Sequence, residues 1–280
     1  MIGSHGRAVI DAGQVRPSRP LSELATGAWA GITGVMTDID DTLTRDGVIE
    51  PAALLALHDL QACSVPVVAI TGRPHGWSLP FAREWPVAAI VAENGAVALI
   101  DGADGVQTEF VQDPVTRAHN ARRLQQVAAQ LLRDVPGATL ARDSAGRLTD
   151  IAVDHSEFAH LDAGSIARVV TLMRAAGMTA TVSSIHINGW FGDHGKWSGA
   201  QWMVQRLFGR RLDDERARWV YIGDSTNDQV MFQRLPHSVG VANLSRFAAE
   251  LTHWPAWITA AERGLGFAEV VQALLSARRC

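Results

Sequence analysis

The sequence predicts an α/β fold: a mainly parallel sheet flanked by helices, with a smaller α+β unit inserted into it. Short apolar runs that end in polar residues alternate with helical stretches over residues 31–100 and 191–280, as in βαβ units. Residues 101–190 instead follow an α-β-β-α-β-β order, which is typical of an antiparallel sheet with its own helices. We therefore expect a discontinuous core domain and one inserted domain.

The composition suits a soluble globular protein. The 280 residues are 47% hydrophobic and 19% charged, and the net charge of -4 gives no reason to expect nucleic acid as a partner. No apolar run has the length of a membrane span, and no signal peptide is recognisable. Cys63 and Cys280 are too few for a disulfide framework, so a cytoplasmic location is expected. Residues 1–30, interrupted by Pro17 and Pro20, are expected to form a loosely ordered extension.

The positions of apolar residues predict the individual elements. In the first part of the core we expect strands at residues 35–37, 65–70 and 88–91, and a helix at 51–60 that begins with proline. The inserted unit is expected to hold two helices and four strands, at residues 114–135, 138–141, 148–153, 162–176, 179–182 and 184–190. The core then resumes with helices at 197–208, 229–235 and 267–277 and strands at 219–222 and 238–241.

Two aspartates follow the first strand of the core. The apolar run before Asp38 stops at that residue, and Asp40 comes two positions later. Binding sites in open α/β sheets lie at the carboxyl ends of the strands. Clustered carboxylates repel one another, so a chain usually keeps them together where a cation or a proton transfer offsets the repulsion. The alternative is a solvated, aspartate-rich turn.

Three further polar groups occur at comparable points. The strand ending at Ile70 is followed by Thr71 and Gly72, a glycine-rich turn leads to Lys196, and the strand at 219–222 continues into Gly-Asp-Ser-Thr-Asn-Asp. This order of motifs resembles the haloacid dehalogenase superfamily of phosphotransferases, over most of the chain after the first thirty residues. The inserted unit is similar to the cap of its subfamily IIB, the Cof-type and sucrose-phosphate phosphatase-like hydrolases. The resemblance implies a Rossmann-like parallel-sheet core with a type IIB cap.

The resemblance also implies roles for the acidic residues. Asp38 is the expected nucleophile, whose carboxylate would attack phosphorus and form an aspartyl-phosphate. Asp40 is the expected general acid/base, and its backbone carbonyl would contact the metal. A Mg²⁺ ion is expected to be bound by Asp38, Asp40 and Asp224. Asp228 is expected to contribute to the same metal site, directly or through water.

Other residues are expected to contact the transferring phosphoryl group. Thr71 and Gly72 offer a hydroxyl and a backbone amide, and Lys196 offers a compact positive charge. Asn227 is assigned to the same role. Asp41 replaces the glycine that is commoner in the superfamily; because aspartate tolerates unusual backbone angles, we expect the loop to form and assign Asp41 no function.

The strand expected at residues 184–190 is the predicted specificity surface. Its side chains alternate, so His186, Asn188 and Trp190 share a polar face. We expect this face to look toward the core site, where His186 or Asn188 would contact the leaving group and Trp190 would stack on a sugar. The alternative is that this polar face is simply exposed to solvent. His186 and His194 lack a cysteine partner and are a poor zinc signal.

The predicted function is that of a Mg²⁺-dependent phosphomonoesterase. The expected substrate is a small sugar phosphate or phosphorylated sugar acid, because the cap resembles those of sucrose-phosphate and mannosyl-phosphoglycerate phosphatases. A phosphosugar mutase using Asp38 and Asp40 is the nearest alternative. A signalling receiver domain is disfavoured because its paired acids precede the phosphorylated aspartate. A non-catalytic sugar-binding protein is disfavoured because every expected catalytic position is filled.

Overall fold

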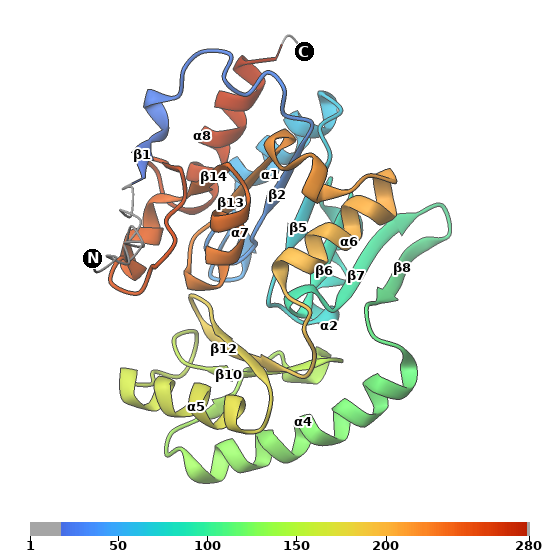
Figure 1. The fold of residues 1–280 in the computed structure, drawn as a ribbon, viewed down its shortest axis with the longest axis vertical. Helices are drawn as coiled ribbons and strands as arrows, with labels where there is room; N and C mark the ends of the chain where they lie inside the picture. The colour runs from blue at the N-terminus through green and yellow to red at the C-terminus, as the bar shows by residue number, and fades with distance from the viewer. Residues whose placement is uncertain (1–17, 279–280) are drawn as a thin grey trace, which may run out of the picture.

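The chain folds into a large α/β part and a smaller α+β part stacked beneath it (Figure 1). The computed structural model describes residues 18–278, so the expectations for residues 1–17 and for Cys280 fall outside the described residues. The large part holds a nine-stranded sheet in the order β1-β15-β14-β13-β2-β5-β6-β7-β8. The small part holds a four-stranded sheet in the order β11-β12-β10-β9. The predicted α/β class is confirmed.

The centre of the large sheet is parallel and fully buried. Its strands are β2 (Gly34–Thr37), β5 (Val67–Ile70), β6 (Ala89–Ala92), β13 (Trp219–Gly223) and β14 (His237–Gly240). Because both faces are covered, these strands are short apolar runs without a polar face. Helices α1 (Pro51–Ala62) and α8 (Arg263–Ser276) cover one face, and α6 (Lys196–Phe208) and α7 (Gln229–Arg234) cover the other. The short elements of this part are α2 (His75–Ser78), α3 (Phe81–Glu84), β3 (Thr44–Arg45) and β4 (Val48–Ile49).

An antiparallel hairpin extends this sheet beyond β6. It consists of β7 (Val97–Gly102) and β8 (Gly105–Phe110), and β7 pairs with β6. The sequence analysis assigns residues 101–110 to the inserted unit, whereas the structure pairs most of them within the main sheet. The hairpin was not predicted because β7 follows β6 after a single turn, so one apolar stretch of the sequence contains two strands.

The inserted unit has the predicted order of elements. Helices α4 (Pro114–Asp134) and α5 (Ala163–Ala175) lie on the side of its sheet away from the large part (Figure 1). The sheet is formed by β9 (Thr139–Leu140), β10 (Asp150–Asp154), β11 (Thr179–Val182) and β12 (His186–Trp190). Residues 184 and 185, expected in a strand, instead form the turn before β12.

The segment at residues 18–30 is part of the core, so the expectation of a loose extension is wrong for these residues. Strand β1 (Arg19–Pro20) pairs in parallel with β15 (Trp257–Ile258) at the sheet edge. Leu21 and Trp29 are 6% and 1% exposed and belong to the same hydrophobic cluster as α1 and α8. Burial of these large side chains outweighs the local effect of the prolines. Over the described range, no helix has both the length and the apolar character to cross a membrane.

Leu21→Ala should therefore destabilise the protein by about 2 kcal/mol or more, because it leaves a cavity in the core. Leu55→Ala is the matched control, since Leu55 is 63% exposed on α1. Urea unfolding followed by circular dichroism measures both. Equal free energies of unfolding for the two variants would mean that the segment contributes nothing to the core.

Candidate active site

Three adjacent parallel strands deliver polar residues to one edge of the sheet. In the order β13-β2-β5, their carboxyl ends lead to Asp224, Asp38 and Thr71. Lys196 is the first residue of α6, which packs against this part of the sheet. The sequence prediction that these four residues converge is consistent with this topology, because carboxyl ends of neighbouring parallel strands meet at one edge.

A buried lysine lies between two buried carboxylates at this edge. Lys196 Nζ is 2.8 Å from Asp38 Oδ1 and 2.6 Å from Asp228 Oδ1. Burial alone would lower the lysine pKa, but the charges of Asp228 and Asp38 outweigh it and raise that pKa. Burial raises the pKa of Asp38 to about 7, with Lys196 opposing and Asp228 adding to the rise. The three groups are therefore electrostatically interdependent.

The carboxylate of Asp228 is fully engaged within the protein. One oxygen accepts from Lys196 and from the hydroxyl of Tyr221. The other accepts from the backbone amides of Asp224, at 2.9 Å, and Ser225, at 3.1 Å. Asp228 thus holds both the lysine and the loop after β13. These bonds suit a positioning role better than direct metal ligation.

Asp224 has weaker partners and is the better candidate for a metal ligand. Its oxygens are 3.4 Å from the Thr42 hydroxyl and 3.5 Å from the Asn243 amide. Oxygens of Asp38, Asp224 and Asp228 lie within 4.8 Å of one another. Burial, followed by repulsion from Asp38 and Asp228, raises the pKa of Asp224 well above its usual value. A donor set of buried carboxylate oxygens fits Mg²⁺, whose charge would offset this repulsion.

The loop after β5 brings the core and the inserted unit into close contact. The Thr71 hydroxyl is buried and accepts from the Arg73 amide at 3.0 Å. At Gly72, a Cβ atom would lie 3.2 Å from Asn188 Oδ1 and 3.3 Å from Asn94 Oδ1, so a side chain there would crowd both amides. On the other side of the site, Asn227 accepts from the Ser225 hydroxyl at 3.0 Å.

Arg73 is a site residue to which the sequence analysis assigns no role. Its Nε lies 2.9 Å from both carboxylate oxygens of Asp40. The same guanidinium contacts Asp143 at 3.2 Å and Glu157 at 2.9 Å, both in the inserted unit. Burial opposes its charge, but Asp40 and Glu157 outweigh burial and raise the Arg73 pKa. Its position directly after Thr71 and Gly72 is the sequence signal that could have identified it.

Asp41 has a structural role in the loop after β2. Its φ of 54° lies in the left-handed region, which aspartate tolerates better than most residues, as the sequence analysis expects. Its carboxylate accepts from Arg263 Nε at 2.7 Å, and its carbonyl accepts from the Asn243 amide at 3.0 Å. The loop therefore forms with the negative charge of Asp41 paired.

A cleft of about 620 Å³ lies between the two parts of the molecule beside these residues. From the inserted unit it is lined by residues of two turns: His155, Ser156, Glu157, Phe158, Ser184 and Ile185. From the core it is lined by residues that include Asp40, Arg73, Asp224, Arg246, Phe247 and Arg263. These turns were not predicted from the sequence, because strand alternation predicts a face and not the turns that end it.

The three predicted specificity residues, His186, Asn188 and Trp190, are not among the residues that line this cleft. Asn188 is 1% exposed and donates to the Gly72 carbonyl and to Asp150, both at 3.2 Å. Trp190 is buried and donates from its indole N–H to the carbonyl of His194 at 2.9 Å. His186 is buried and bonds to Glu157. Asn188 thus docks on the core, His186 bonds within the inserted unit, Trp190 bonds to the segment that leads back to the core, and none of the three lines the cleft.

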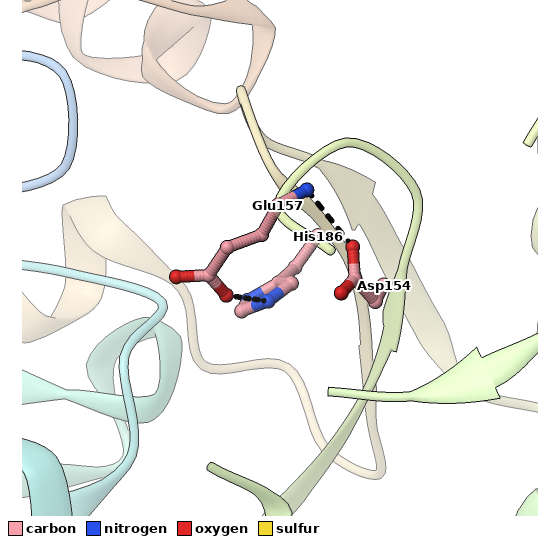
Figure 2. A group of neighbouring side chains, drawn as sticks. All are labelled: Asp154, Glu157 and His186. Atoms are coloured by element: carbon pink, nitrogen blue, oxygen red, sulfur yellow. Dashed lines mark hydrogen bonds and ion pairs between the residues drawn. The ribbon is translucent and has the colours of Figure 1, made fainter. Parts of the chain in front are cut away.

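A second acidic cluster lies in the inserted unit (Figure 2). Oxygens of Asp154 and Glu157 and a ring nitrogen of His186 lie within 4.8 Å of one another. Asp154 accepts from two backbone amides of the turn it starts, those of Glu157 and Phe158. Glu157 lies between His186, at 2.9 Å, and Arg73. These partners account for the cluster as an internal ion-pair network, and His194 is outside it.

Comparisons with known proteins agree with the resemblance to the haloacid dehalogenase superfamily. The family model for haloacid dehalogenase-like hydrolases matches residues 35–142. No curated protein matches the chain. Solved structures match most of it, among them Thermoplasma acidophilum 0175, with a TM-score of 0.65, 16% identity, and coverage of 88% of this chain and 99% of that one.

Two further solved structures are phosphatases by name. The sucrose-phosphatase of Synechocystis sp. PCC6803, solved with sucrose and phosphate, has a TM-score of 0.62 and 13% identity, and the match covers 87% of this chain and 98% of that one. A subclass IIB sugar phosphatase of the haloacid dehalogenase superfamily has a TM-score of 0.59 and 13% identity, covering 87% and 99%. At such identities the likeness establishes the fold.

The family match and the shared fold together confirm the resemblance seen in the four motifs. Residues 35–142 match the family model for haloacid dehalogenase-like hydrolases, and the fold of the described residues is that of the solved sucrose-phosphatase and subclass IIB sugar phosphatase. We therefore call the nine-stranded part the core and the inserted part the cap.

His194, in the segment between β12 and α6, should make the protein sensitive to acid. It is buried beside the ring of Trp190, with ring centroids 5.7 Å apart, and burial lowers its pKa to about 4. The unfolded chain takes up a proton near pH 6.5 while the folded chain does not, so stability is lost as the pH falls from about 6.5 toward 4. The loss should reach roughly 2–3 kcal/mol.

His194→Phe should remove this part of the acid sensitivity, because phenylalanine keeps a ring but cannot be protonated. Urea unfolding at several pH values between about 7.5 and 4 measures it. His119→Phe, at an exposed position of α4, is the matched control. If His194→Phe and wild type lose stability in parallel, the histidine is not the acid-sensitive group.

Proposed function

We propose that this protein is a Mg²⁺-dependent phosphomonoesterase that acts on a small phosphorylated metabolite, with a sugar phosphate as the best candidate. The observation that carries the proposal is the pairing of Asp38 with Lys196, with Asp224 on the adjacent strand and Asp40 at the cleft. This combines a candidate nucleophile, a fixed positive charge, a candidate metal ligand and a candidate acid/base in one site.

Asp38 is the proposed nucleophile. Its carboxylate attacks phosphorus and releases the alcohol, and water then hydrolyses the aspartyl-phosphate. Lys196 holds one oxygen of the carboxylate at 2.8 Å and places positive charge where the phosphoryl group would bind. The Thr71 hydroxyl and the Gly72 amide are proposed to donate to the phosphoryl oxygens, with Asn227 supporting the opposite side.

Mg²⁺ would be held by Asp38, Asp224 and the backbone carbonyl of Asp40, with Asp228 fixing the surrounding loop. When bound, it would neutralise the charge that otherwise keeps an anionic phosphate away from a carboxylate.

Asp40 is the proposed general acid/base. It would give a proton to the departing oxygen and later take one from the attacking water. Arg73 holds its carboxylate through Nε, which fixes its orientation at the cleft wall.

The leaving group is proposed to lie in the cleft. A volume of about 620 Å³ suits a sugar-sized group. Ser156 and Ser184 offer hydroxyls for hydrogen bonds, and Phe158 and Ile185 offer apolar contact to ring carbons. In this proposal the cap turns, and not His186, Asn188 or Trp190, make the direct contacts with the substrate.

Asp38→Asn should abolish phosphate release while the fold survives, because the amide is nearly isosteric but cannot attack phosphorus. Release of inorganic phosphate from a panel of sugar phosphates, with Mg²⁺ present, measures this. Asp104→Asn, at an exposed aspartate in the turn between β7 and β8 and outside the cleft, is the matched control and should keep wild-type activity. Substantial turnover by Asp38→Asn that is free of deamidated protein would exclude the covalent mechanism.

Asp224→Ala should weaken Mg²⁺ binding by at least about tenfold, because it removes one of two ionic ligands. Isothermal titration calorimetry with MgCl₂ alone measures this without any substrate. Asp104→Asn again serves as the control. Unchanged Mg²⁺ affinity in Asp224→Ala would place the metal elsewhere.

A further inference from the structure

Two buried arginines connect the cap to the catalytic loops. Arg73 of the core contacts Asp40 and reaches the cap at Asp143, 3.2 Å away. Arg147 of the cap contacts the same Asp143 through the other carboxylate oxygen, also at 3.2 Å. The side chains of Arg73 and Arg147 are 5% and 2% exposed. Asp143 therefore joins two buried cations that would otherwise repel one another.

Arg147 continues the connection to the loop after β5. Its Nη1 donates to the Gly72 carbonyl at 2.9 Å and to Asp150 at 2.9 Å. Asp150 in turn accepts from Asn94 of the core at 3.1 Å. The Gly72 carbonyl thus has a charged partner that belongs to the cap. Because Gly72 follows Thr71, this contact fixes the loop proposed to bind the phosphoryl group.

The backbones of the cap and the core approach one another closely beside these residues. A Cβ atom placed on Gly76 of α2 would lie 2.9 Å from the Cα atom of Gly146 in the cap. Nearby, the buried Glu93 of the core accepts from the backbone amides of Leu148 and Thr149. Backbone therefore meets backbone at this point, and a side chain at Gly76 would force the cap away from the core.

We propose that Asp143 and Arg147 are positioning residues, which couple the seating of the cap to the order of the catalytic loops. When the cap is seated, Arg147 fixes the Gly72 carbonyl and Asp143 fixes Arg73, which holds Asp40. Neither residue lines the cleft, so both act through core groups. The catalytic part of this inference rests on the proposed phosphatase function, whereas the coupling of loop order to cap seating does not.

Asp143→Asn tests the coupling, because the amide keeps the shape but loses the charge shared by both arginines. With p-nitrophenyl phosphate and MgCl₂ as the probe, kcat should fall at least about tenfold while KM changes less than about threefold. Hydrogen exchange should accelerate at least about tenfold at residues 71–74 of the core as well as at residues 147–150 of the cap. Asp104→Asn, at an exposed aspartate in the turn between β7 and β8, is the matched control for both measurements.

Gly76→Leu tests the same coupling without altering a charged group. Its side chain should hold the cap off the core, and it should reproduce both the fall in kcat and the faster exchange at residues 71–74. Gly31→Leu is the control, since nothing lies within 4 Å of a Cβ atom at that exposed position.

The outcomes of these experiments distinguish a failure of the proposed coupling from a failure of the proposed phosphatase function. Faster exchange at residues 71–74 in both variants supports the coupling, and a selective fall in kcat supports its catalytic consequence. Unchanged exchange at residues 71–74 in either variant overturns the coupling, and a kcat within twofold of wild type, when the wild type is active, overturns its catalytic consequence. If wild type releases no p-nitrophenol and no phosphate from the metabolite panel, the proposed function fails, and the exchange data alone decide the coupling.

Discussion

The ion pairs of Lys196 with Asp38 and Asp228 are the constraint on which the site depends. Three charged groups are buried together at the end of the central strands, and removing one partner of such a group typically costs about 3–5 kcal/mol. Each partner is itself anchored: Asp38 by β2, Asp228 by two backbone amides of the loop after β13, and the lysine by the first turn of α6. The fold therefore fixes the site from three elements at once.

The contact between cap and core has a different character from the interior of either part. Each part has its own apolar cluster, whereas polar side chains and backbone groups bridge the two parts. Buried polar groups are stabilising only when their partners are in place. Such a contact favours a single position of the cap on the core over many loosely packed positions. It also means that little apolar surface would become exposed to water if the cap separated from the core.

The sequence was sufficient to predict β2, β5 and β13, because each of these apolar runs ends at a polar residue that belongs to a motif. Asp38, Thr71 and Asp224 could be placed at one sheet edge from topology alone, whereas Lys196, at the start of a helix, was assigned from the order of the motifs. The role of Asp143 could not be predicted, because it depends on a contact between residues far apart in the chain. For β12, alternation predicted the correct face of Asn188 but not its partner, since a face can dock on protein as readily as it can bind a ligand.

Strand β1 has a consequence for how the large sheet ends. An uncovered edge strand presents unpaired N–H and C=O groups to which a strand of another molecule can add. Here Arg19 and Pro20 occupy the edge beside Trp257, with the Arg19 guanidinium 4.0 Å from the indole ring, and proline brings no N–H group to the new edge. Proteolytic cleavage just after this segment would thus expose β15 and create a surface prone to intermolecular strand addition.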